Sequence, residues 1–173
     1  MADRPPFVDA HVHFWDRDLL RYPWLESPAM AAIGSTYTPA HYRAEAAAWN
    51  LVAAVHVEAG AHEGDSEAET VWLDECAETS GLPTAFVARE ALDDPDLDRK
   101  LARLSEHGRV KGVRHLVNWH PLDAARRAYP SNLTVSEVWR KGFARLGTYG
   151  FSFDFHGFPP QLPGLVEVAR RHP

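Results

Sequence analysis

Cysteine is almost absent from this sequence, which contains one, Cys76, among 173 residues. A single cysteine excludes an internal disulfide and any cysteine-rich zinc site. Lysine and arginine never gather beyond short pairs and the formal net charge is −6, so binding of nucleic acid through its phosphates is disfavoured. No run approaches the ~20 apolar residues of a membrane span, and no apolar signal core precedes the first predicted strand. These absences favour a cytoplasmic protein that binds neither nucleic acid nor a membrane.

Histidine, by contrast, is plentiful, because the chain carries ten, several of them in or beside apolar runs. The rest of the composition, 45% hydrophobic and 24% charged, is ordinary for a globular chain long enough to build a core. We therefore expect residues 1–173 to form a single domain that binds a small-molecule substrate.

Strand-like and helix-like segments alternate five times along the chain. Predicted strands cover residues 7–12, 51–57, 84–89, 110–115 and 150–156; predicted helices cover about 39–50, 66–80, 97–107, 135–146 and 162–171. This alternation predicts a parallel sheet with helices outside it. No Gly-x-Gly-x-x-Gly follows the first strand, so a dinucleotide-binding sheet is not expected.

Apolar residues at helical spacing predict which face of each helix is buried. The predicted stripes of the second and fourth helices are Ala68, Val71, Trp72 and Cys76, and Val135, Val138, Trp139 and Leu146. Gly81 is predicted to end the second helix as a C-terminal cap. The connection over residues 14–39 is long and rich in aromatics and prolines, so we expect a folded loop that helps to wall a pocket.

Polar residues concentrate where the predicted strands end. His11 and His13 alternate along the first strand and so project from one face, where two imidazoles can grip one metal ion. In a (β/α)₈ barrel the carboxyl ends of the strands converge on the active site. The other polar residues at strand ends are His56 and Glu58, Arg114 and His115, and Asp154 and His156.

Each of these residues also has a plain structural interpretation. His56 could hydrogen-bond a neighbour in the core, Arg114 could pair with a carboxylate, and Asp154 could cap a turn or face solvent. The His-x-His pair could arise by chance on a half-buried strand. The joint placement of these groups at successive strand ends favours a functional site.

The segment Val8-Asp-Ala-His-Val-His-Phe-Trp-Asp16 resembles the opening strand of the amidohydrolase superfamily. The Phe-Trp pair after the histidines is similar to the Amidohydrolase 2 branch, with its L-fuconolactonase-like and pyrone-dicarboxylate lactonase-like enzymes. Further resemblances follow in the family's order and cover essentially the whole chain: Tyr22-Pro-Trp-Leu25, Tyr37-Thr-Pro39, Val55-His-Val-Glu-Ala59, Ala68-Glu-Thr-Val-Trp-Leu73 and Lys111-Gly-Val-Arg114.

The resemblance implies a (β/α)₈ barrel of TIM-barrel type that hydrolyses lactones of sugar acids or aromatic catabolites, with or without a divalent metal such as zinc or manganese. It makes His11, His13 and His156 metal ligands or, in metal-free members, substrate ligands. It places Arg114 against a carboxylate or the reacting carbonyl oxygen, to which its planar fork is suited. The predicted catalytic residues are His11, His13, Arg114 and His156, and the predicted substrate-binding residues are Trp15, His56, Glu58, His115 and Asp154.

The chain departs from the family in its length. A barrel of this kind typically has about 250 residues, so the sequence supplies roughly five of eight β/α units. The superfamily's sixth-strand histidine motif and its water-activating Asp at the end of the eighth strand have no counterpart here. We expect the amino-terminal part of a longer enzyme; the alternative is a short protein that closes its sheet by homo-oligomerisation.

Three functions stay open at this point. The first is a metal-assisted lactonase. The second is a metal-independent lactonase or a related decarboxylase. The third is an inactive chain that binds a ligand or associates with itself.

Overall fold

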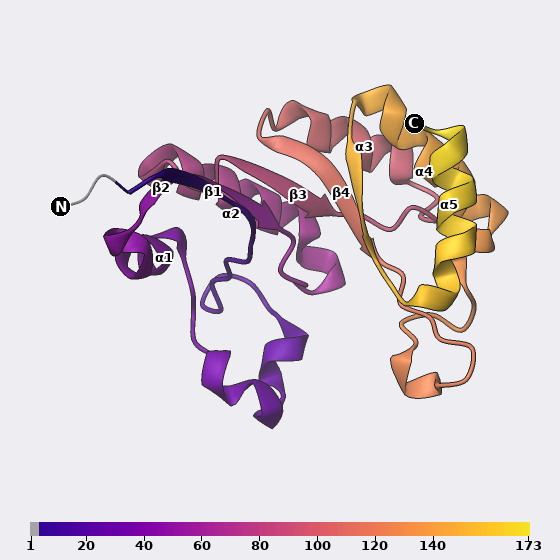
Figure 1. Ribbon diagram of the computed structural model, residues 1–173, viewed down its shortest axis with the longest axis horizontal. Helices are drawn as coiled ribbons and strands as arrows, with labels where there is room; N and C mark the ends of the chain where they lie inside the picture. Colours follow the sequence, from indigo (N-terminus) through magenta and orange to yellow (C-terminus); the bar gives the residue numbers. More distant parts are fainter. Residues whose placement is uncertain (1–3) are drawn as a thin grey trace. The chain divides into compact units, whose positions relative to one another are not determined.

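The computed structural model describes residues 4–173, so residues 1–3, on which the expectation about a signal segment partly rests, lie outside the described part. The chain divides into two compact units. The first ends at Ala88 and also contains His107–Val110, and the second comprises Arg89–Glu106 and Lys111–Pro173. Figure 1 follows the chain in colour from indigo at the amino terminus to yellow at the carboxyl terminus.

The first unit is built on the strands β1 (Pro6–Val12), β2 (Asn50–Val57) and β3 (Ala85–Arg89), the last of which ends in the second unit. β1 pairs with β2 and β2 with β3, both in parallel. The β1–β2 register shifts twice and then places Val12 opposite His56. The polar carboxyl ends of β1 and β2 are therefore adjacent.

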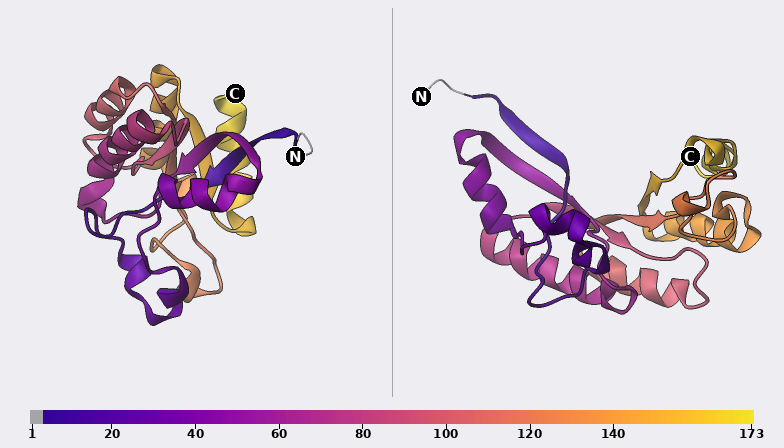
Figure 2. Two further views of the ribbon diagram at one scale, coloured as in Figure 1. Left: turned by 90° about the vertical axis from the view of Figure 1, so that its left-hand side faces the viewer. Right: turned by 90° about the horizontal axis from the view of Figure 1, so that it is seen from below.

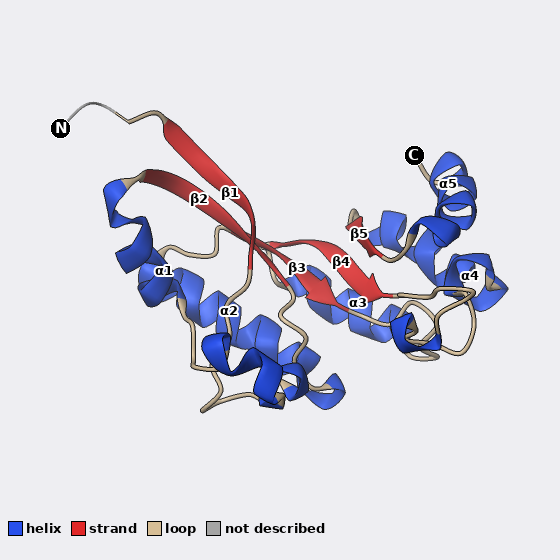
Figure 3. Cartoon of the chain, turned by 60° about the horizontal axis from the view of Figure 1, so that its bottom comes forward, coloured by secondary structure: helices blue, strands red, loops and turns tan. Residues whose placement is uncertain are grey.

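Two helices complete this unit, α1 (Pro39–Glu45) and α2 (Ser66–Ser80), and α2 runs along one face of the strands (Figures 2 and 3). α1 begins at Pro39, as predicted, because proline suits the first helical position. It ends at Glu45, and the prediction of a helix to residue 50 was wrong by about one turn. A 3₁₀ turn over Ala46–Ala48 and an extended Trp49 lead directly into β2. The C-cap of α2 is Gly81, as predicted, and its φ of 73° is in the left-handed region.

The long connection between β1 and α1 is a folded lobe, as predicted. It contains 3₁₀ helices over Pro23–Glu26 and Pro28–Ile33, and it is closed at its base by paired backbone hydrogen bonds of 2.9 Å between Trp15 and Tyr37. Trp24 ties the lobe to the segment after β2 by donating its Nε1–H to the Ala59 carbonyl at 2.7 Å. The buried residues of its small core are Trp15, Tyr22, Leu25, Ala59 and Ala61.

The second unit contains α3 (Leu97–Glu106), β4 (Val110–Leu116), α4 (Glu137–Leu146), β5 (Ser152–His156) and α5 (Leu162–Arg171), the first residue of β4 belonging to the first unit. β4 and β5 pair in parallel, with Arg114 opposite Asp154 and Leu116 opposite His156. Trp139 of α4 is fully buried against Phe153 of β5, with ring centroids 5.6 Å apart. One face of β4 and β5 is thus covered by α4.

β3 and β4 are hydrogen-bonded within each unit. Phe86 N–H donates to the Arg109 carbonyl in the first, and Glu90 N–H donates to the Arg114 carbonyl in the second. The strands therefore follow one another in the order β1-β2-β3-β4-β5, each followed by a helix. This order confirms the predicted α/β class with five β/α units; that residues 1–173 form a single domain stays a prediction.

Short 3₁₀ helices occupy several connections of both units: Glu63–Asp65, Ala124–Arg126, Leu133–Val135, Gly147–Tyr149 and Pro159–Gln161. Among residues 4–173, no helix has both the length and the apolar character needed to cross a membrane.

Candidate active site

The predicted histidine pair is the centre of the candidate site in the first unit. The Nε2 atoms of His11 and His13 lie 3.1 Å apart at the carboxyl end of β1, and the two rings meet edge to face. Two nitrogens bound at ~2.0–2.1 Å to one tetrahedral zinc ion lie about 3.3 Å from each other. The spacing of the pair therefore fits two ligands of a single ion.

The orientation of His13 is fixed from the neighbouring strand. Its Nδ1 lies 2.7 Å from the backbone carbonyl oxygen of Val57, at the end of β2. A carbonyl only accepts hydrogen bonds, so Nδ1 carries the proton and a neutral ring keeps its lone pair on Nε2. This is the arrangement by which proteins orient metal-binding histidines.

Asp9 and Tyr42 support the other histidine. The Asp9 carboxylate accepts the His11 backbone N–H at 3.0 Å through one oxygen and the Tyr42 hydroxyl at 2.6 Å through the other. Burial and the Asp9 carboxylate raise the pKa of the Tyr42 hydroxyl, which therefore stays protonated and keeps donating. The contact of Tyr42 with Asp9 could not be predicted from the sequence, because the spacing of Tyr42 on α1 carries no signal of it.

His56 and Glu58 lie at the end of β2 and are fully buried. His56 accepts the Phe14 backbone N–H on Nδ1 at 3.1 Å, and its ring centroid lies 6.3 Å from that of His13. Glu58 accepts the Gly60 N–H at 2.8 Å. The structure thus brings His11, His13 and His56 into one cluster; substrate binding by His56 and Glu58 stays a prediction.

Trp15 follows the histidine pair and lies in the core of the lobe. It is 9% exposed and donates its Nε1–H to the Ser35 carbonyl at 2.6 Å. Its ring lies 5.8 Å from that of Trp24 and 5.6 Å from that of Tyr37. The residue holds the lobe beside the histidines, and its contact with a substrate stays a prediction.

In the second unit, the paired strands β4 and β5 carry a second set of polar residues. Arg114 and Asp154 are direct partners, and His156 lies two residues beyond Asp154. Paired residues and those two positions apart share a face of the sheet, so Arg114, Asp154 and His156 project from one face. This face is opposite the one that packs Phe153 on α4.

His115 points to the other face of β4 and is 3% exposed. Its Nδ1 lies 3.2 Å from both the Leu92 N–H and the Trp139 Nε1–H, so this nitrogen accepts and the proton of the neutral ring is on Nε2. Nε2 lies 2.6 Å from the Tyr129 hydroxyl. Burial lowers the pKa of His115 to about 4, the Asp93 carboxylate opposing and Arg89 adding to this shift. His115 is therefore a neutral anchor for Tyr129; its predicted contact with substrate remains untested.

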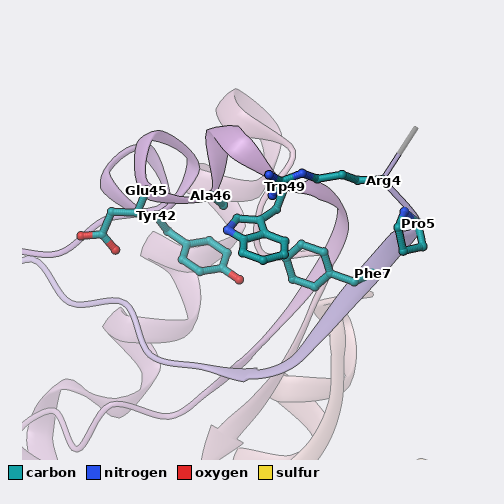
Figure 4. Close-up of a pocket in the computed structure, with 7 residues that line it drawn as sticks. All are labelled: Arg4, Pro5, Phe7, Tyr42, Glu45, Ala46 and Trp49. Carbon is teal, nitrogen blue, oxygen red and sulfur yellow. The ribbon is translucent and has the colours of Figure 1, made fainter. Parts of the chain in front are cut away.

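A cavity of about 680 Å³ lies at the amino-terminal end of β1 and shares only Tyr42 with the residues described above (Figure 4). Its lining residues are Arg4, Pro5, Phe7, Tyr42, Glu45, Ala46 and Trp49. The Arg4 guanidinium lies over the Trp49 ring, 4.6 Å from its centroid. Active sites of β/α barrels form at the carboxyl ends of the strands, so we do not assign the chemistry to this cavity.

Within residues 4–173, no group of three or more His, Cys, Asp or Glu side chains is arranged to hold a metal ion. The pair His11–His13 supplies two nitrogens of suitable spacing and orientation. These two nitrogens are part of the ligand set that a divalent metal needs. The assignment of His156 as a further ligand stays a prediction.

Comparison with known proteins identifies the family. The amidohydrolase family model Amidohydro_2 matches residues 8–173, so the chain belongs to the amidohydrolase family. An uncharacterized protein, y4mH, of Sinorhizobium fredii (strain NBRC 101917 / NGR234) is 30% identical over an alignment of 173 positions that covers 96% of this chain and 58% of that protein.

Solved structures extend the likeness to the fold. An amidohydrolase from Burkholderia multivorans with bound zinc is 27% identical and superposes with a TM-score of 0.72, over 95% of this chain and 54% of that one. A candidate 2-pyrone-4,6-dicarboxylic acid hydrolase from Acinetobacter baumannii is 15% identical with a TM-score of 0.63, over 94% and 54%. The fold is thus a partial (β/α)₈ barrel of the amidohydrolase type. The chain spans somewhat more than half the length of the relatives that it matches.

Proposed function

We propose that the intact protein is a metal-assisted hydrolase that opens a lactone of a sugar acid or of an aromatic catabolite. The observation that carries this proposal is the His11–His13 pair, whose Nε2 atoms lie 3.1 Å apart with His13 oriented by the Val57 carbonyl. Membership of the amidohydrolase family and the zinc bound to the Burkholderia multivorans relative support it. The Acinetobacter baumannii structure supports the substrate class, because a pyrone is a cyclic ester.

His11 and His13 would hold the metal, for which zinc and manganese are both candidates, and His156 is the proposed third ligand. A bound divalent metal polarises a carbonyl oxygen and lowers the pKa of bound water. Arg114 would receive a substrate carboxylate or carbonyl oxygen through its planar fork. The side chains proposed to contact the substrate are those of Trp15, His56, Glu58 and Asp154.

The test is to purify the intact protein, measure its metal content and assay it on a panel of sugar-acid and aromatic lactones. We expect lactone hydrolysis in the wild type and a loss of at least about a hundredfold in kcat/KM for His11→Ala. His62→Ala is the matched control, because His62 is an exposed histidine of the same unit. Its Nδ1 accepts a local hydrogen bond, from the Gly64 N–H. Full activity of His11→Ala would remove the pair from the mechanism.

A metal-independent lactonase is the second candidate, and the same pair supports it. The 3.1 Å separation of the two Nε2 atoms also suits a direct hydrogen bond, in which His11 donates to His13. During turnover this hydrogen bond would open and His13 would carry a proton on both ring nitrogens, so that His11, His13 and Arg114 could each donate to a developing oxyanion. Unchanged turnover after exhaustive chelation, in protein without bound metal, would favour this mechanism over the first.

The remaining alternatives are distinguished in the same assays. Release of carbon dioxide from carboxylated substrates, without lactone opening, would identify a decarboxylase. Ligand binding or self-association with no turnover would identify a binding protein. We propose a small molecule as the substrate or ligand, and a second copy of the chain as the partner where the protein associates with itself.

A further inference from the structure

Asn118 makes a contact with His156 that defines the proton position on this histidine. The Nδ1 atom of His156, at the end of β5, lies 2.9 Å from the side-chain oxygen of Asn118, just beyond β4. In this orientation of the Asn118 amide the oxygen accepts, so Nδ1 of His156 carries the proton. The neutral ring then has its lone pair on Nε2.

The backbone around Asn118 is held on both sides by a single side chain. Gln161 donates its Nε2–H to the Val117 carbonyl at 2.7 Å and accepts the Trp119 N–H on Oε1 at 3.0 Å. In addition, the Asn118 carbonyl accepts the Ala128 N–H at 2.8 Å. The position of Asn118 is therefore fixed by the residues before and after it and by its own backbone.

Gln161 itself is fully buried and its amide orientation is determined by four contacts. Besides Val117 and Trp119, it accepts the Phe158 N–H at 2.9 Å and donates to the Asn132 side-chain oxygen at 3.2 Å. Rotation of the amide by 180° would set its NH₂ group against two N–H donors, which is unfavourable in a buried site. Gln161 thus fixes the segment that follows β4 relative to the segment that follows β5.

We propose that Asn118 is a positioning residue that holds His156 as the Nδ1–H tautomer and presents Nε2 as the ligating or basic atom. His13 shows the same pattern, with Nδ1 donating to an oxygen acceptor and Nε2 keeping its lone pair. Second-sphere acceptors of this kind orient metal-binding histidines. The partner of Nε2 rests on the proposed function, whereas the tautomer itself does not.

The direct test is to determine the His156 tautomer by nitrogen-15 NMR of the intact, metal-free protein at pH 8. His156→Gln assigns the resonances by removing them. We expect the Nδ1–H form in the wild type and in Asn118→Asp, which keeps an oxygen acceptor, and a shift to the Nε2–H form in Asn118→Leu. An Nε2–H or doubly protonated ring in the wild type would overturn the proposal, and so would an unchanged tautomer in Asn118→Leu.

A matched control and a second readout separate positioning from stability. Leu122→Ala changes an exposed residue of the same segment and should leave the tautomer as it is. Zinc affinity, measured by chelator competition, should fall about 10–100-fold in Asn118→Leu. In Asn118→Asp it should stay within about threefold of the wild type. If the tautomer shifts while zinc affinity does not, the positioning role holds and the metal part of the proposed function fails.

Discussion

The candidate histidines owe their orientation to side chains and carbonyls that sequence spacing does not reveal. His13 is held by a backbone oxygen of the next strand, and the segment carrying His11 is anchored by Asp9 and Tyr42. A hydrogen bond to a charged acceptor contributes about 1.5–3 kcal/mol when partly shielded and less when exposed. Tyr42 is therefore as relevant to this site as the histidines that the sequence displays.

Tyr42→Phe tests this anchor. Removing the hydroxyl leaves the half-buried Asp9 carboxylate without one of its donors, so we expect a loss of about 1–2 kcal/mol in the free energy of unfolding in urea. Tyr37→Phe is the control, because the Tyr37 hydroxyl donates to the exposed Glu45, and it should lose no more than about 0.5 kcal/mol. Equal losses in the two variants would contradict the anchoring role.

His115 predicts a pH dependence of stability. Its pKa is lowered to about 4 in the folded protein, so the unfolded chain takes up the proton first as the pH falls below about 6.5. The contribution of His115 to the free energy of unfolding is therefore at its full value above about pH 6.5. It falls as the pH drops toward 4, and the loss is about 2–3 kcal/mol at pH 4.5.

His115→Gln isolates this effect, since glutamine does not titrate. Urea unfolding at pH 7.5 and pH 4.5 gives the free energy of unfolding of wild type and variant. From the higher to the lower pH, the wild type should lose about 2–3 kcal/mol more than the variant. The groups facing the ring are the Leu92 and Trp139 N–H donors and the Tyr129 hydroxyl, with Asp93 and Arg89 as the nearby charges. A pH-independent difference would show that His115 is not held neutral.

At the scale of elements, the strands could be predicted, whereas the buried faces of α2 and α4 could be predicted only in part. Strands were predictable because apolar runs end in polar residues and are bounded by proline and glycine. In α2 the predicted Trp72 is buried, but the predicted Val71 is exposed, and the stripe also missed the buried Glu69 and Leu73. In α4 the predicted Trp139 and Leu146 are buried, whereas the predicted Val135 and Val138 are exposed. Helical spacing gives the period of a stripe, but the partner that covers it is fixed by tertiary packing.

Gly142 shows the limit of local propensity within α4. A Cβ at this position would lie 1.8 Å from the Leu92 carbonyl oxygen, so the helix contacts the segment after β3 through bare backbone. Gly142→Ala should destabilise the protein by at least about 2 kcal/mol, although alanine favours helices by up to about 1 kcal/mol. Gly147→Ala, with nothing within 4 Å of the added carbon, should be neutral or slightly stabilising in the same urea unfolding assay. A stabilised Gly142→Ala variant would contradict the close approach.

At the scale of the whole molecule, each unit carries polar strand-end groups of the kind that the sequence predicted. His11, His13 and His56 lie together in the first, and Arg114, Asp154 and His156 share a face in the second. These groups were predictable because parallel strands of one chain end at one edge of a sheet. Asn118, Gln161 and Tyr129 were not, because they lie in connections between strands and helices whose conformation has no periodic signature.

The most direct measurement of the central claim is zinc binding by the intact protein with and without the imidazole of His13. The wild type should bind zinc, and His13→Ala should weaken binding at least about a hundredfold in chelator competition, while His62→Ala should match the wild type. Zinc affinity that is the same in wild type and His13→Ala would contradict the assignment of the His11–His13 pair as metal ligands.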